Sequence, residues 1–164
     1  METPREEQIG PLLRARTLRL ALAESCTGGL VGHRLTNVPG SSDYYMGSVT
    51  AYANAAKMKL LGVQMDTLLQ HGAVSAETVR EMARGVRGAL GAGLGISISG
   101  IAGPGGGSPE KPVGLVWFGL SAADGEWALE QHFEGDRLAV KEQAAEFALQ
   151  LGIDYLEGRL DGSD

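Results

Sequence analysis

Short apolar segments alternate with helical segments over most of this chain. Segments 17–23, 47–53 and 94–99 are rich in apolar or β-forming residues, which is typical of buried strands. Two more such segments, 113–121 and 126–133, meet at a turn around Gly125 and predict a hairpin. The alternation therefore predicts a three-layer α/β/α fold with a mixed, mostly parallel sheet and a C-terminal antiparallel hairpin.

Helical spacing and capping residues mark the expected helices. Pro11 suggests that the first helix, at 6–16, begins near this proline, because proline is favoured in a first helical turn. Ser75 and Asp136 are candidate N-caps of two amphipathic helices, the second of which extends to about Leu156. The other expected helices are 27–36, 55–61 with Asn54 as its cap, and 66–71, and the tail 158–164 is expected to fray.

Length and composition limit the classes of protein to which the chain can belong. Its 164 residues are enough for one compact domain, spanning 1–164, without a disulfide or a metal to stabilise it. Hydrophobic residues make up 43% and charged residues 21% of the chain, as in ordinary globular proteins. No apolar run approaches the roughly 18 residues of a transmembrane helix, and the charged N-terminal segment is unlike a secretory signal.

Cysteine content and charge add expectations about location and partners. The single cysteine, Cys26, cannot form an internal disulfide, which favours a reducing compartment and hence a cytoplasmic protein. The net charge of −6 disfavours nonspecific nucleic-acid binding, which requires a positive surface. A small anionic ligand held by a few donors is compatible with this charge. Apolar edge strands favour a homo-oligomer.

Glycine is the residue type in excess. The chain has 25 glycines, about twice the usual share of roughly 7%, and they cluster at 28–29, 91–95 and 100–107. Glycines after apolar segments predict sharp turns and a backbone that closely approaches another group. Because open α/β sheets bind ligands outside the carboxyl ends of their strands, the candidate sites are the loops 24–29, 50–57 and 99–112.

The loop at 24–29 places Ser25 and Cys26 at the predicted start of a helix. Free backbone N–H groups and the helix dipole at such a place can hold a phosphate or an oxyanion. Ser25 is therefore a candidate nucleophile, although an N-cap serine fits the same pattern. Cys26 is an alternative nucleophile, although a lone thiol after a strand is more often simply buried.

The loop at 50–57 contributes Tyr52 and Lys57. A partly desolvated lysine can lose its proton near neutral pH and act as a base, as it does in serine–lysine pairs. Most lysines are solvated surface charges, so the spacing alone leaves both interpretations open. Tyr52 offers a phenol that could relay a proton or could simply pack with its hydroxyl bonded.

The third loop, at 99–112, matches no phosphate-binding motif, but its glycines could form an anion-binding nest or a flexible crossover. Arg137, at the start of the last predicted helix, is a candidate phosphate ligand or a surface arginine. The histidines, His33, His71 and His132, lack the spacing of metal ligands, so no metal site is predicted.

Six sequence blocks, taken together, form a recognisable pattern. They are AESCTGG at 23–29, PGSS at 39–42, VTAYAN at 49–54 followed by Lys57, HGAVS at 71–75, SISGIAGPGGGSPEKPVG at 97–114 and EGDR at 134–137. The chain thereby resembles the CinA C-terminal domain family, in the family's order and over nearly the whole chain. The resemblance implies the same three-layer α/β/α fold.

The resemblance also implies an activity, the hydrolysis of the carboxamide of nicotinamide mononucleotide to nicotinate mononucleotide and ammonia, with no cofactor. It implies that Ser25 acts as the nucleophile with Lys57, that Tyr52 lies near the pair and that Arg137 binds the substrate phosphate. N–H groups near 26–28 would then hold the developing oxyanion. The further residues expected to bind substrate are Cys26, Thr27, Gly28, Ser42, Asn54, Ser99, Gly100, Ala102 and Gly103.

Two other functions stay open on the sequence alone. A nucleotide-binding or regulatory module of the same fold would need the glycine loops and Arg137 but no chemistry. An amidase for a different carboxamide would keep Ser25 and Lys57 without the phosphate contact. The expected partner is a small-molecule nucleotide substrate, and neither nucleic acid nor a membrane is expected.

Overall fold

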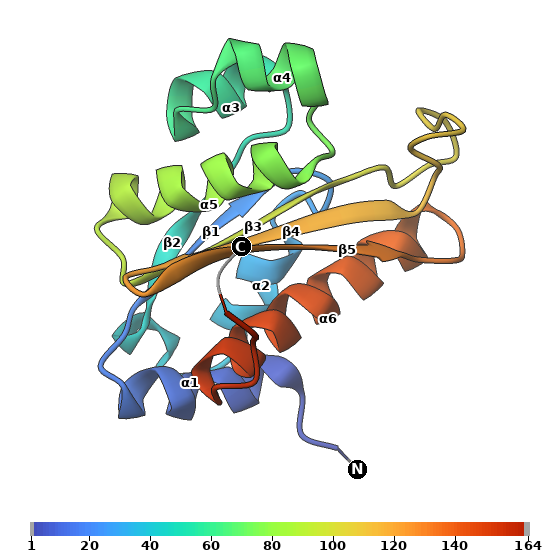
Figure 1. Cartoon of the computed structure of the whole chain (residues 1–164). Coiled ribbons are helices and arrows are strands. Elements are labelled where there is room, and N and C mark those ends of the chain that lie inside the picture. The colour runs from blue at the N-terminus through green and yellow to red at the C-terminus, as the bar shows by residue number, and fades with distance from the viewer. Residues whose placement is uncertain (1, 163–164) are drawn as a thin grey trace.

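A computed structural model describes residues 2–162, and its centre is a five-stranded sheet (Figure 1). In chain order the strands are β1 (Leu20–Glu24), β2 (Tyr45–Thr50), β3 (Leu94–Gly100), β4 (Leu115–Ala122) and β5 (Gly125–His132), and their spatial order is β2-β1-β3-β4-β5. β1 pairs in parallel with β2 and β3, whereas β3–β4 and β4–β5 are antiparallel pairs. The predicted mixed sheet and its C-terminal hairpin are confirmed.

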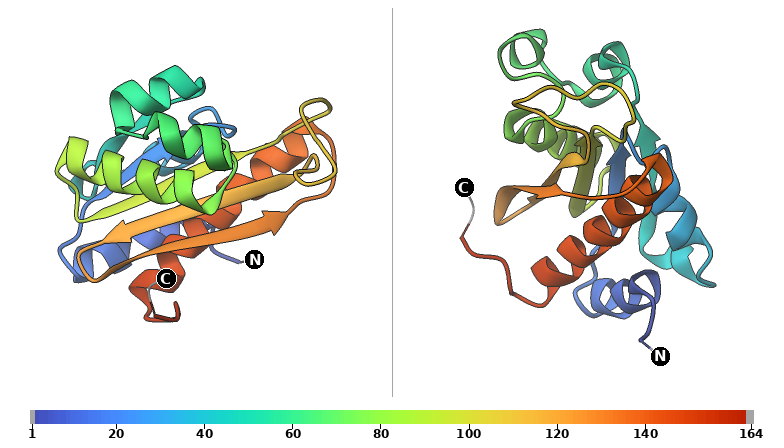
Figure 2. Two further views of the ribbon diagram at one scale, coloured as in Figure 1. Left: turned by 45° about the horizontal axis from the view of Figure 1, so that its top comes forward. Right: turned by 90° about the vertical axis from the view of Figure 1, so that its right-hand side faces the viewer.

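Helices cover both faces of this sheet, so the predicted three-layer arrangement is also confirmed (Figures 1 and 2). One face carries α1 (Arg5–Ala15), α2 (Leu30–Thr36) and α6 (Arg137–Leu156). The other face carries α5 (Ala76–Leu90), over which α3 (Asn54–Leu61) and α4 (Met65–His71) pack. Within residues 2–162, no helix combines the length and apolar composition needed to cross a membrane.

The two faces are packed differently. Large aliphatic and aromatic side chains, among them Phe118, fill the face under α6, whereas alanine and valine dominate the face under α5. A Cβ at Gly119 would lie 2.2 Å from the Val79 carbonyl oxygen, and one at Gly85 would lie 1.8 Å from the Leu61 carbonyl oxygen. These glycines therefore allow α5 to lie directly on both the sheet and α3, the close backbone approach that the glycine content predicts.

Capping explains where two of the longer helices begin. The Ser75 side chain accepts a hydrogen bond from the Thr78 N–H at the start of α5, and Asp136 accepts one from the Ala139 N–H at the start of α6. Both predicted N-caps are confirmed. Each cap accepts a hydrogen bond from an N–H that has no acceptor within its own helix.

Three predicted helix starts are wrong. α1 begins at Arg5 and continues through Pro11, which removes one backbone hydrogen bond, the one to the carbonyl of the exposed residue Glu7. Asn54 is the first residue of α3 and makes no side-chain cap. α2 begins only at Leu30, because the two preceding glycines have φ values of +61° and +101°, in the left-handed region.

The described part of the C-terminal tail contacts the core. Leu160 packs against the large cluster, and the Trp127 indole N–H donates to the Asp161 carbonyl oxygen at 2.5 Å. Residues 163–164, the end of the tail that is predicted to fray, lie outside the described residues. The edge strands of the sheet are β2 and β5, and a homo-oligomer through these edges stays a prediction.

Candidate active site

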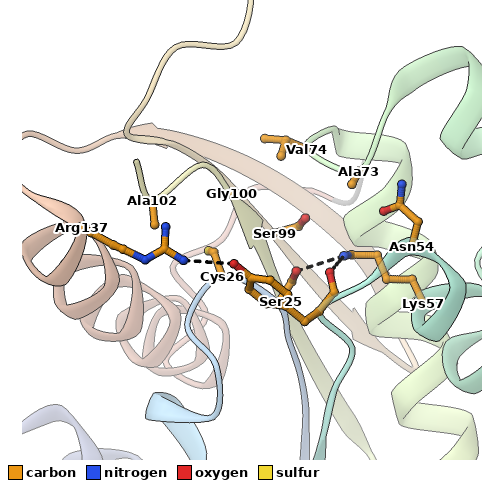
Figure 3. A pocket seen from close by; sticks show the side chains of 11 residues that line it. Ser25, Cys26, Asn54, Lys57, Ala73, Val74, Ser99, Gly100, Ala102 and Arg137 are labelled. Atoms are coloured by element: carbon orange, nitrogen blue, oxygen red, sulfur yellow. Dashed lines mark hydrogen bonds between the residues drawn. The ribbon is translucent and has the colours of Figure 1, made fainter. Parts of the chain in front are cut away.

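The three candidate loops come together at the carboxyl ends of β1, β2 and β3, where they line a pocket of about 170 Å³ (Figure 3). Because neighbouring parallel strands end at the same edge of the sheet, the convergence follows from the topology. The lining residues are Ser25, Cys26, Tyr52, Asn54, Lys57, Ala73, Val74, Ser99, Gly100, Ala102 and Arg137.

Ser25 is the first residue after β1 and is held from two sides. Its backbone N–H donates to the Ile98 carbonyl oxygen at 3.0 Å, which ties the turn to the neighbouring strand β3. Its hydroxyl oxygen lies 3.0 Å from Lys57 Nζ, and the two groups are hydrogen-bonded (Figure 3). Positions 25 and 57 are far apart in the chain, so the fold brings a serine and a lysine into direct contact.

Lys57 is almost completely buried, with 2% of its surface exposed. Its Nζ donates to the Tyr52 carbonyl oxygen at 2.9 Å, and no carboxylate among the described residues forms an ion pair with it. Burial lowers the pKa of Lys57, because the charged form loses its hydration. A neutral amine has N–H donors for the carbonyl and a lone pair for the Ser25 hydroxyl, which is the arrangement of a general base.

Tyr52 is oriented differently from the expected proton relay. Its backbone carbonyl, rather than its phenol, contacts Lys57. The phenol oxygen accepts a hydrogen bond from Arg137 Nη2 at 3.0 Å, while Arg137 Nη1 donates to the Gly103 carbonyl oxygen at 2.7 Å. Arg137 thus links the side chain of Tyr52, a residue that is 62% exposed, to the glycine-rich loop at the mouth of the pocket.

The start of α2 is not available to a ligand, contrary to the sequence-based expectation. The N–H groups of Val31 and Gly32 donate to the carboxylate of Glu24 at 3.0 and 2.9 Å, and the Thr27 hydroxyl donates to the same carboxylate at 2.6 Å. The Gly28 N–H donates to the Ser25 carbonyl oxygen. Fully buried Glu24 therefore supplies from within the chain the negative charge that a helix start attracts.

Two other backbone N–H groups, those of Cys26 and Gly100, lie beside the pocket and close to the Cys26 sulfur. The Ile98 carbonyl points toward β1, whereas the Ile101 N–H points toward β4. Because successive N–H groups of a strand point in opposite directions, the Gly100 N–H points toward β1. The Cys26 sulfur lies against the N–H groups of Cys26 and Gly100. Burial raises the pKa of the Cys26 thiol to about 11, so the thiol stays protonated at neutral pH and is a poor nucleophile.

The structure brings most, but not all, of the expected site residues together. Ser42 lies in the short 3-10 helix before β2, at the opposite end of the strand from Tyr52, and does not line the pocket. Thr27 and Gly28 hold the turn behind Ser25 rather than the pocket wall, and the Gly103 carbonyl accepts a hydrogen bond from Arg137 without lining the pocket. Among residues 2–162, no three histidine, cysteine or acidic side chains cluster as metal ligands.

Three residues of the site carry little or no signal in the sequence. Ala73 and Val74, in the turn between α4 and α5, complete the pocket wall opposite Arg137 (Figure 3). Their side chains carry no chemical signal, and the sequence marks them only as part of the HGAVS block at 71–75, directly before the Ser75 cap. Glu24 directly precedes Ser25, and a buried acid at the end of an apolar strand could have indicated a structural role for its carboxylate.

These observations define a class: an α/β protein with a hydrogen-bonded serine–lysine pair at the carboxyl ends of its parallel strands. Residues 2–156 match the sequence model of the CinA C-terminal domain. The chain therefore belongs to the CinA C-terminal domain family.

The chain is similar in sequence both to a protein of about its own length and to longer proteins. The chain is 51% identical over 147 residues to the "nicotinamide-nucleotide amidohydrolase PncC" of Enterobacter agglomerans, covering 89% of the chain and 90% of that protein. It is 53% identical over 146 residues to the "putative competence-damage inducible protein" of Moorella thermoacetica, covering 89% of the chain but 35% of that protein. The chain thus spans about a third of the length of several longer relatives.

Solved structures share the fold as well. A CinA superfamily protein from Klebsiella pneumoniae superposes with a TM-score of 0.90 at 35% identity, covering 95% of this chain and 99% of that one. A CinA superfamily protein from Escherichia coli superposes with a TM-score of 0.85 at 34% identity, covering 91% and 90%.

Proposed function

We propose that the protein is an amidohydrolase that converts nicotinamide mononucleotide to nicotinate mononucleotide and ammonia. The observation that carries the proposal is the 3.0 Å contact between the Ser25 hydroxyl and buried Lys57 inside a pocket open to solvent. The similarity to a nicotinamide-nucleotide amidohydrolase along nearly the full length of both chains supports the choice of substrate.

The first chemical step uses the depressed pKa of Lys57. Neutral Lys57 takes the proton of the Ser25 hydroxyl, and the oxygen attacks the carboxamide carbon. The proton passes directly between the two groups, because the Tyr52 phenol is bonded to Arg137 and only the Tyr52 carbonyl contacts Lys57. Tyr52 therefore acts in this mechanism by orienting the amine.

The tetrahedral intermediate then places negative charge on the former carbonyl oxygen. We propose that the N–H groups of Cys26 and Gly100, whose present neighbour is the weakly accepting Cys26 sulfur, stabilise that charge. The charged Lys57 returns its proton to the amide nitrogen, which leaves as ammonia. Water hydrolyses the resulting ester of Ser25 by the same proton transfers in reverse.

Substrate binding divides between the pocket and its mouth. A pocket of about 170 Å³ accommodates the pyridine carboxamide, while the ribose and phosphate extend past Arg137. Arg137 has five N–H donors, of which two are engaged by Gly103 and Tyr52, and the others can bind a phosphate. The pyridinium ring withdraws electrons from the amide, so the nucleotide should react faster than free nicotinamide.

The test is an ammonia-release assay on nicotinamide mononucleotide, its dephosphorylated riboside and free nicotinamide. We expect turnover to be fastest with the nucleotide and to be lost in Ser25→Ala, whereas Cys26→Ala, a change at the neighbouring position, should retain activity. Nucleotide binding without ammonia release would contradict the proposal in favour of a non-catalytic binding module. Release that does not depend on the phosphate would point to an amidase for another carboxamide.

A further inference from the structure

The glycine-rich loop after β3, at residues 101–114, is closed at its base. The Ile101 N–H donates to the Leu115 carbonyl oxygen at 2.9 Å, and the Gly114 N–H donates to the Ile101 carbonyl oxygen at 2.8 Å. Residues 104–110, which form its outer part, are all exposed. The base therefore fixes the loop to the sheet, whereas the position of the outer part depends on contacts with other elements.

Two side chains attach this loop to helices on opposite faces of the sheet (Figures 1 and 2). Arg137, at the start of α6, donates from Nη1 to the Gly103 carbonyl oxygen at 2.7 Å. On the other face, Lys111 of the loop donates from Nζ to the carbonyl oxygen of His71, the last residue of α4. The loop thereby connects the two helical layers at the end of the sheet where the pocket opens.

Lys111 is well placed to make its contact with α4. The last carbonyls of a helix have no partner within the helix, and a lysine ammonium is a favourable donor to them. The Ser108 N–H donates to the Lys111 carbonyl oxygen at 2.9 Å, and the Lys111 N–H donates to the Ser108 hydroxyl at 3.1 Å, so a tight turn holds the backbone that carries the side chain. Within residues 2–162, the Lys111 ammonium forms no ion pair with a carboxylate.

The end of α4 is a fixed point of attachment. The carbonyl oxygen of Gly72, directly after the helix, accepts hydrogen bonds from the Ser75 hydroxyl at 2.9 Å and from the Thr78 hydroxyl at 2.7 Å. These contacts come from the start of α5 and do not involve the loop. Lys111 therefore attaches the loop to a turn that has its own support, and loss of Lys111 should free the loop rather than the turn.

The position of the loop affects the orientation of Arg137. The Gly103 carbonyl is one of the two acceptors that hold the guanidinium, and the other is the phenol of the exposed residue Tyr52 at 3.0 Å. If the loop moves, the Gly103 carbonyl moves with it, and Arg137 loses one of these acceptors. Lys111 does not line the pocket, yet the loop connects it to the arginine at the pocket mouth.

We infer that Lys111 is a positioning residue: it binds the end of α4 and so fixes the glycine-rich loop, and the loop holds the Arg137 guanidinium where it binds the substrate phosphate. The inference rests on the proposed amidohydrolase function and adds a residue outside the pocket to it. Because Lys111 touches neither the substrate nor Ser25, its removal should weaken substrate binding and leave the chemical step almost unchanged.

The first experiment compares KM and kcat of the native protein and Lys111→Met, which keeps most of the side-chain length and removes the ammonium. KM for nicotinamide mononucleotide should rise about fivefold, while kcat stays within about twofold. The riboside has no phosphate, so its kcat/KM should change by less than about twofold. Lys111→Arg keeps a cation that can reach the same carbonyl and should restore KM to within about twofold. A loss in kcat alone, or equal losses on both substrates, would overturn the inference.

A double-mutant cycle tests whether Lys111 acts through Arg137, which it does not contact. Introduced into Arg137→Met, the change Lys111→Met should lower kcat/KM for the nucleotide by less than about twofold, because the group that it positions is already gone. Independent, multiplicative losses would contradict the link. Lys59→Met is the matched control, because Lys59 is an exposed lysine of α3 without an ion pair within residues 2–162. A similar rise of KM in this control would assign the effect to net charge and reject the inference.

The attachment of the loop can also be measured without turnover. Endoproteinase Glu-C cleaves after glutamate, and Glu110 lies in the exposed part of the loop. Cleavage after Glu110, followed by mass spectrometry, should be about tenfold faster in Lys111→Met than in the native protein or Lys59→Met. Equal rates would reject the attachment. A native protein that releases no ammonia would refute the proposed function and the role of Lys111 in substrate binding together, whereas a native amidase with an unchanged KM in Lys111→Met would refute the inference alone.

Discussion

Two buried ionisable side chains, Glu24 at the end of β1 and Lys57 on the helix after β2, lie at the same end of the sheet but have opposite surroundings. The Glu24 carboxylate accepts three hydrogen bonds, from Val31, Gly32 and Thr27. Lys57 contacts one hydroxyl and one carbonyl and has no ion-pair partner among the described residues.

The difference shows how one sheet end can carry both structure and chemistry. Three donors compensate the loss of hydration of the Glu24 carboxylate, and this side chain fixes the turn that holds Ser25. Lys57 lacks such compensation, which lowers its pKa and favours the neutral form that the proposed mechanism uses as a base. Substitutions at and around the two side chains test both parts of this comparison.

The largest effect is expected for Lys57→Met, which keeps the length of the side chain and removes the amine. Ammonia release should fall at least about 1,000-fold, because both the base for Ser25 and the acid for the leaving ammonia are lost. The free energy of unfolding should stay equal or rise, because a desolvated amine is removed. Near-native turnover in folded Lys57→Met would remove the lysine from the mechanism.

Glu24→Gln should disrupt the hydrogen bonds by which the Glu24 carboxylate holds the turn after β1. The substitution replaces one carboxylate oxygen with an NH₂ group, which then faces a backbone N–H donor. We therefore expect urea unfolding to show that the free energy of unfolding falls by about 2–3 kcal/mol. Activity should fall as well, because the Ser25 turn loses its anchor. Glu146→Gln is the control, since Glu146 is half exposed in its ion pair with Arg34 and should cost less than about 1 kcal/mol. Equal losses in the two variants would contradict the assigned role of Glu24.

Arg137→Met tests a charge at the pocket mouth, where solvent is near. We expect kcat/KM for the nucleotide to fall about tenfold, because the guanidinium both orients Tyr52 and offers donors to the phosphate. The riboside, which has no phosphate, should lose less. Tyr52→Phe removes only the phenolic hydroxyl and should lower kcat/KM for the nucleotide less than Arg137→Met does. Identical losses on nucleotide and riboside would separate Arg137 from phosphate binding.

The pH dependence follows from the lowered pKa of Lys57. Activity should rise with pH through the lowered pKa, because the neutral amine is the base. Between that pKa and the ordinary lysine value of about 10.4, the unfolded chain binds more protons than the folded one, so stability should also rise with pH. This rise should be absent in Lys57→Met, which has no amine to titrate at this position. Urea unfolding across the pH range measures it, and matching stability profiles of the native protein and Lys57→Met would contradict the lowered pKa.

The smallest effect is expected for Cys26→Ser. The pKa of about 11 keeps the thiol protonated, so the side chain contributes packing rather than chemistry, and kcat should change by less than about threefold. Loss of turnover to the level of Ser25→Ala would make Cys26 the nucleophile in place of Ser25. The ammonia-release assay on both variants gives the answer.

Much of the fold and the position of the pocket could be predicted, because strand alternation and caps such as Ser75 and Asp136 are local signals. The predicted loops converge because parallel strands end together. The boundary of α2 could not be predicted from spacing, since it depends on two left-handed glycines. The role of Glu24 could not be predicted because its partners lie up to eight residues away, and Ala73 and Val74 carry no chemical signal at all.

The central claim is that burial makes Lys57 a neutral amine beside Ser25, and NMR titration of lysine labelled with ¹³C at Cε measures this directly. The Lys57 resonance, assigned by its absence in Lys57→Met, should titrate at a lower pH than the side chain of free lysine. A Lys57 resonance that titrates at or above the pH of free lysine would show that the amine stays charged, and it would contradict the account.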